Sequence, residues 1–92
     1  MNLCIRKARR KDLPAVVALL AQFDGKSAVS LSAAARVYAG MAKYPSYTCY
    51  LATEHADAVG MFTLLVFPGL AGGGALEARV GDVVVAAASA AR

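Results

Sequence analysis

The hydrophobic period of this chain changes at Tyr47, and that change constrains the possible folds more than any other feature. Between residues 13 and 23, apolar side chains recur at the spacing of a helix that buries one face. From Tyr47 onward the period is two, so that Tyr47, Cys49 and Leu51 share one side of an extended segment. Helices followed by consecutive strands indicate an α+β fold with a mainly antiparallel sheet.

Local signals set the expected helix boundaries. Asp12 is a suitable N-cap and Pro14 suits a first helical turn, so we predict a first helix from Leu13 to about Gln22. A second helix begins near Ser30 or Ser32, either of which can serve as its cap. The second helix ends before residues 44–46, and its apolar side is formed by Ala34, Val37, Tyr38 and Met41.

The strands follow from alternation and from β-branched or aromatic content. The predicted strands are Leu3–Ala8, a segment that starts at Tyr47, Ala58–Phe67 and Ala75–Val85. Residues 54–57 form a turn between the second and third strands. The resulting order is βααβββ, with two helices before an antiparallel meander.

Composition limits the function classes. The chain has 92 residues, of which 59% are hydrophobic, a mean hydropathy of +0.53 and a formal net charge of +4. A single domain is expected, with some apolar surface covered by another element or chain. No apolar run reaches the ~20 residues that span a bilayer, so we expect a cytoplasmic protein without a membrane segment. The basic cluster at residues 6–11 carries no nucleic-acid motif, and His55 has no ligand partners at metal-binding spacing.

Three segments together resemble a known superfamily. The chain resembles the GNAT superfamily of acetyl-CoA-dependent N-acetyltransferases in three places. They are the opening strand Leu3–Ala8 with the basic residues 9–11 that follow it, the segment Asp57–Phe62, and the segment Gly81–Val85. The resemblance covers residues 1–92 as one partial domain, the N-terminal half of an acyl-CoA N-acyltransferase fold. It ends just before the Q/R-x-x-G-x-G/A turn that holds the cofactor pyrophosphate, and it implies Arg92 as the first residue of that turn. In this fold the first two strands are neighbours, so Cys4 and Cys49, expected to be reduced, would lie close enough to oxidise on storage.

The resemblance also implies a set of site residues. Backbone groups of Val83, Val84, Val85 and Ala86 would contact the pantetheine arm and thioester of acetyl-CoA. Asp82 is the first candidate for the base that takes the amine proton. Glu77 is the alternative, although an odd separation along a strand puts it on the opposite pleat from Asp82. The competing interpretation is that both acids are ordinary solvent-facing strand residues.

Two functional hypotheses remain open from the sequence. In the first, the chain is a truncated half-domain of an acetyltransferase whose acceptor is a small-molecule or peptide amine. In the second, it is a non-catalytic remnant or an interaction module that associates through the exposed edge of the fourth strand. Both predict a partner, either a second copy of the chain or a complementing C-terminal half. Shortening of a longer gene product is a third possibility.

Overall fold

A computed structural model describes residues 2–24 and 29–86. In chain order the elements are β1 (Leu3–Lys7), the 3-10 turn η1 (Arg10–Asp12), α1 (Leu13–Asp24), α2 (Leu31–Met41), β2 (Tyr47–Glu54), β3 (Asp57–Pro68) and β4 (Leu76–Val85). This order confirms the predicted α+β fold. Neither described helix is long and apolar enough to cross a bilayer.

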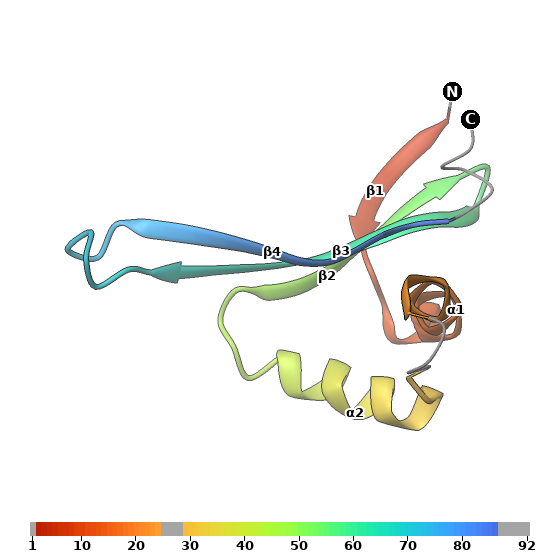
Figure 1. Ribbon diagram of the computed structural model, residues 1–92, viewed down its shortest axis with the longest axis horizontal. Helices are drawn as coiled ribbons and strands as arrows, with labels where there is room; N and C mark the ends of the chain where they lie inside the picture. Colours follow the sequence, from red (N-terminus) through yellow and green to blue (C-terminus); the bar gives the residue numbers. More distant parts are fainter. Residues whose placement is uncertain (1, 25–28, 87–92) are drawn as a thin grey trace.

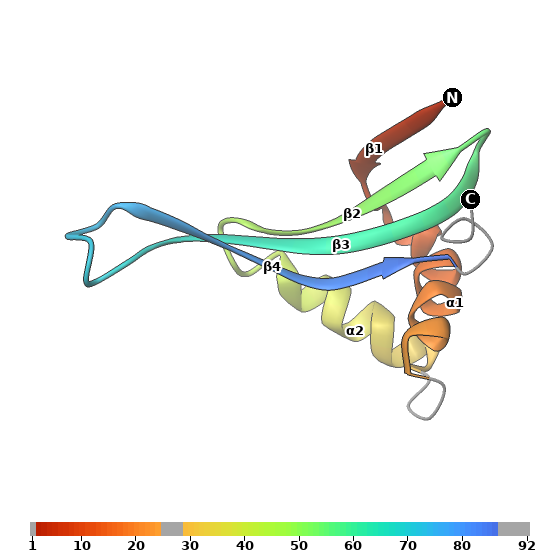
Figure 2. The same cartoon turned by 45° about the horizontal axis from the view of Figure 1, so that its top comes forward.

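The sheet is an antiparallel meander with the helices on one of its faces (Figures 1 and 2). The strand order is β1-β2-β3-β4, so β1 and β4 are its outer strands among the described residues. His55 and Ala56 join β2 to β3 and have φ angles of 51° and 68°, the left-handed pair that a two-residue hairpin turn requires. The β3–β4 hairpin extends past the helices as a long two-stranded arm (Figure 1).

The helix starts follow from local hydrogen bonds. Ser30 is the cap of α2, because its Oγ accepts from the Ala33 N–H at 3.1 Å. Asp12 does not play the predicted role of N-cap for α1. Its carboxylate instead accepts from the Arg9 N–H at 2.7 Å and pairs with Arg6 at 2.7 Å, which fixes the turn η1 onto β1. Helix α1 also runs two residues beyond the predicted end, to Asp24.

The core lies between the sheet and the helices. Leu51 on β2 is 1% exposed and packs in one cluster with Val16 and Leu19 of α1 and Met61 of β3. The other face of the sheet carries a stacked pair, Tyr50 and Phe62, with ring centroids 5.1 Å apart, and exposed apolar residues that include Ile5 and Val80. No described helix covers this second face.

The two cysteines are farther apart than expected. Cys4 is exposed and lies opposite Thr53 near the end of β2, whereas Cys49 is buried near the start of that strand. Four residues of strand separate Thr53 from Cys49, which corresponds to about 13 Å. A disulfide needs Cα atoms within about 7 Å. The expectation that the two thiols lie close enough to oxidise is therefore wrong.

Candidate functional site

A β-bulge interrupts β4 and shapes the candidate site. Between the pairs Met61–Val84 and Thr63–Gly81, β3 advances by two residues while β4 advances by three. The bulge therefore consists of Asp82 and Val83, which lie opposite a single residue of β3. Asp82 has a φ of 51°. A non-glycine residue in the left-handed region is uncommon, although aspartate is among those that tolerate it. A bulge re-aims side chains locally, and here it redirects Asp82.

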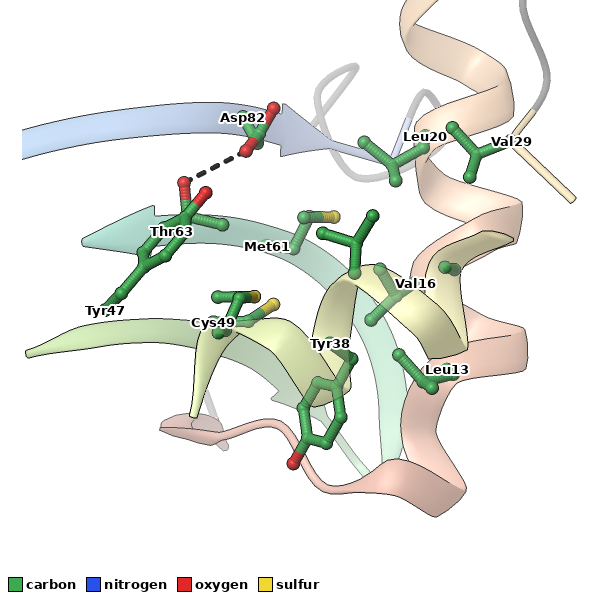
Figure 3. Close-up of a pocket in the computed structure, with 13 residues that line it drawn as sticks. Leu13, Val16, Leu20, Val29, Tyr38, Tyr47, Cys49, Met61, Thr63 and Asp82 are labelled. Carbon is green, nitrogen blue, oxygen red and sulfur yellow. Dashed lines mark hydrogen bonds between the residues drawn. The ribbon is translucent and has the colours of Figure 1, made fainter. Parts of the chain in front are cut away.

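Asp82 is held over the helix-covered face of the sheet by Thr63. The Thr63 hydroxyl donates to Asp82 Oδ2 at 3.0 Å, and Thr63 itself is only 8% exposed (Figure 3). Gly81 leaves room for this contact, because a Cβ at that position would lie 3.2 Å from Thr63 Oγ1. The carboxylate is therefore oriented, yet Asp82 as a residue stays exposed and accessible to a ligand.

A cavity of about 190 Å³ opens between the two helices and strands β2–β4, with Asp82 and Thr63 on one wall (Figure 3). Its other walls are almost entirely apolar. Representative lining residues are Leu13, Val16 and Leu20 from α1, Val37 and Met41 from α2, and Met61 from β3. The predicted apolar side of α2, which includes Ala34 and Tyr38, forms one wall of this cavity.

A second cavity, of about 280 Å³, lies on the other side of Asp82. It shares Tyr47, Thr63 and Asp82 with the first cavity and is also lined by Arg79. Asp82 therefore lines both an apolar cavity and a cavity whose lining includes Arg79. We name them the helix-side cavity and the Arg79 cavity.

Glu77 does not join this site. It pairs with Phe67 far along the β3–β4 arm, and four residues of β3, about 13 Å of strand, separate Phe67 from Thr63. The side chain of Glu77 lies against Gly69, where an added Cβ would overlap the carboxylate. The register also corrects the predicted pleat: Glu77 is on the Thr63 face of the sheet, as Asp82 is, because the bulge cancels the odd separation.

The residues predicted to contact acetyl-CoA differ in their surroundings. Val83 and Val85 are 56% and 55% exposed, whereas Val84 is 6% exposed and points into the core. The N–H of Ala86 already donates to the Val59 carbonyl at 2.8 Å. On the side away from β3, the β4 backbone faces no other described strand. Arg92 lies outside the described residues.

Thr63, Tyr47 and Arg79 are site residues that the sequence analysis missed. Thr63 had a detectable signal, because it alternates with Met61 and Leu65 on the inward face of β3 and is polar where they are apolar. Arg79 had no such signal, since Arg79 and Asp82 lie at an odd separation on β4 and only the bulge between them brings both to the same site.

Another lining group, the Cys49 thiol, has a raised pKa because of its burial and, secondarily, the nearby charge of Asp82. In the part of the chain that the structure describes, no cluster of side chains is suited to hold a metal ion.

Several solved structures with the same arrangement are named as acetyltransferases. A protein assigned as an acetyltransferase from Agrobacterium tumefaciens superposes with a TM-score of 0.81 at 29% identity, over 92% of this chain and 60% of its own. Glucosamine-6-phosphate N-acetyltransferase from Arabidopsis thaliana gives a TM-score of 0.79 at 16% identity, over 96% of this chain and 63% of its own. A GNAT family acetyltransferase from Staphylococcus aureus gives 0.76 at 11% identity, over 96% and 65%.

No protein-family model matches the chain, and no curated protein sequence matches it either. The likeness is therefore carried by the fold, and the chain spans about three fifths of the length of these structures. What the matched region contains is the meander, the two helices on one face and the N-terminal strand. The chain has the fold of the N-terminal half of the GNAT N-acetyltransferases, the superfamily that its sequence resembles.

Proposed function

We propose that this chain supplies the acceptor-binding half of an N-acetyltransferase that moves an acetyl group from acetyl-CoA to a primary amine. The fold likeness supports the reaction class. The observation that carries the proposal is the position of Asp82, an accessible carboxylate oriented by Thr63 on the wall of a cavity large enough for a small acceptor. The proposal includes a cytoplasmic location, where cysteines stay reduced.

The chemistry assigns distinct roles to the two residues. In acetyl transfer the amine nitrogen forms a bond to the acetyl carbon, the C–S bond of the thioester breaks, and the amine gives up a proton. Asp82 accepts that proton, directly or through a water molecule, as a general base. Thr63 is a positioning residue, because its hydroxyl holds one carboxylate oxygen and leaves the other available. Glu77 has no part in the step.

Strand β4 is suited to hold the thioester end of acetyl-CoA, the source of the activated acetyl group. It is an outer strand among the described residues, so its backbone groups on one side are open to a ligand. The proposed backbone contacts are those of Val83, Val84, Val85 and Ala86, of which Val83 and Val85 are exposed. Ala86 would contribute its carbonyl, because its N–H is already bonded to the Val59 carbonyl. Arg92 is proposed for the pyrophosphate, together with a C-terminal half or a second copy of the chain.

Two measurements test the proposal. The first is a calorimetric titration of the chain with acetyl-CoA, for which micromolar binding is expected and the absence of binding would overturn the proposal for this polypeptide. The second is acetyl-CoA-dependent thiol release over a panel of primary amines. Asp82→Asn is expected to lower turnover by about two to four orders of magnitude, the usual contribution of a general base. Glu77→Gln is the matched control, and equal losses in both variants would remove Asp82 as the base.

A second candidate function is association through the β4 edge. Its support is an outer strand with two exposed valines, Val83 and Val85, since unpaired apolar edges favour pairing with another chain. The expected result is a dimer or larger species by light scattering at micromolar concentration. Val85→Lys is expected to shift that species toward the monomer, because a lysine on an edge strand opposes pairing. A mass of one chain for the unmodified protein would refute this function.

A further inference from the structure

We infer that the acceptor is an apolar monoamine: a primary amine whose body is about the size of a phenyl or isoamyl group and which carries no second cation. The inference rests on the proposed function and adds to it the substrate class. It follows from three properties of the site, which are the walls of the helix-side cavity, the position of its one carboxylate, and the charge of the Arg79 cavity beyond it.

The helix-side cavity suits an apolar body. Its walls are side chains such as Leu20, Val37 and Met61, and Asp82 is its only charged lining residue among those that the structure describes. The several hydroxyls of an amino sugar would lose water there and find few partners, because the polar groups of the lining are limited to Asp82, Thr63, Cys49 and two tyrosines. A cavity of ~150 Å³ holds a benzene ring, so about 190 Å³ accommodates a ring or a branched chain of similar size.

The position of Asp82 fixes the end at which the amine lies. Its carboxylate is on the wall shared by the two cavities, and the bond from Thr63 orients it (Figure 3). A carboxylate attracts an ammonium group and gives it a charge-assisted hydrogen bond. An acceptor with its apolar body between the helices therefore presents its nitrogen at Asp82.

The Arg79 cavity excludes a longer polycationic acceptor. A ligand that continues past Asp82 enters the space lined by Arg79. A second ammonium group there would lie near the positively charged side chain of Arg79, and like charges at close range repel. Polyamines are thus disfavoured twice, by the apolar walls on one side of Asp82 and by Arg79 on the other.

The test is an equilibrium binding experiment by NMR on the isotope-labelled chain without acetyl-CoA. Phenethylamine is titrated in parallel with spermidine and glucosamine. Phenethylamine is expected to bind at least about tenfold more tightly than either, because only it buries an apolar ring, and to shift the amide signals of Thr63 and Asp82. Equal or tighter binding of spermidine or glucosamine, or no saturable binding of phenethylamine, would overturn the inference.

Two variants locate the binding site. Val37 lines the cavity yet is 61% exposed, so Val37→Asn makes a wall polar without emptying the core, and it is expected to weaken phenethylamine binding several-fold. Ala39→Asn is the matched control, because Ala39 is an exposed position of the same helix outside the cavity lining. Asp82→Asn is expected to weaken binding of phenethylamine but not of 2-phenylethanol, which lacks the charge. Equal affinities in Val37→Asn and Ala39→Asn would place the ligand elsewhere and refute the inference.

The failure of this inference and of the proposed function can be distinguished, since the binding experiment needs no acetyl transfer. Phenethylamine binding without thiol release would support the ligand class and refute the transferase. Thiol release with polyamines or amino sugars, and none with phenethylamine, would support the transferase and refute the apolar monoamine.

Discussion

Replacement of Leu51 by alanine tests the arrangement of the core most directly. Leu51 lies in the middle of β2, is 1% exposed and packs against both α1 and β3. Truncating a fully buried leucine costs about 3–4 kcal/mol, from the lost burial of its carbons and from the cavity that remains. A domain of this length has a total stability of roughly 5–14 kcal/mol. The variant is therefore expected to lose about a fifth or more of its free energy of unfolding, and about 12–32 °C in Tm.

The assay is urea unfolding followed by circular dichroism, with the same substitution at Leu70 as the control. Leu70 lies in the turn between β3 and β4 and is 100% exposed, so Leu70→Ala is expected to change stability by less than about 0.5 kcal/mol. The slope of free energy against urea should be unchanged in both variants. Similar midpoints for Leu51→Ala and Leu70→Ala would refute the core described above.

Three further predictions use local features of the fold. Gly40→Ala, in α2 with open space around the added Cβ, is expected to stabilise the chain by up to about 1 kcal/mol, measured as a rise in Tm. Gly81→Ala is expected to destabilise it and to shift the NMR signals of Thr63, because the new Cβ crowds the Thr63 hydroxyl; unchanged signals would contradict this. The hydrogen bond from Arg6, with that of the Arg9 N–H, holds the pKa of Asp12 well below its usual range. Its contribution to stability is thus complete above about pH 4 and is lost as the pH falls, and Asp12→Asn should flatten this acid limb in denaturation midpoints taken from pH 5 to pH 2.

Most of the fold was predictable because its signals are local. The change of period at Tyr47, the cap at Ser30 and the turn before β3 each depend on residues adjacent in the sequence, and each is present in the structure. Asp12 shows the limit of such reasoning. Its residue type favours an N-cap, but Arg6 on the neighbouring strand and the Arg9 N–H take both carboxylate oxygens.

The candidate site was predictable only in part. Asp82 was identified through the family resemblance, which implies an acidic residue just before the apolar run of this strand, and its role as a base stays a prediction. The assignment of Glu77 to the opposite pleat assumed an uninterrupted strand, and the bulge invalidates that assumption. The bulge itself depends on how β4 pairs with β3, and no alternation within β4 alone reveals it.

The sequence by itself determined the class of fold and the order of its elements, because periodicity and turn signals act within a few residues. Only the tertiary structure decided the site. The β-bulge, one extra residue of β4 in its pairing with β3, brings Asp82 to the same face as Thr63 and Arg79 beside two cavities. The apolar walls of the helix-side cavity come largely from two helices that are distant from β3 and β4 in the sequence. Strand register and helix placement are properties of the folded whole, since they depend on which distant surfaces are buried together.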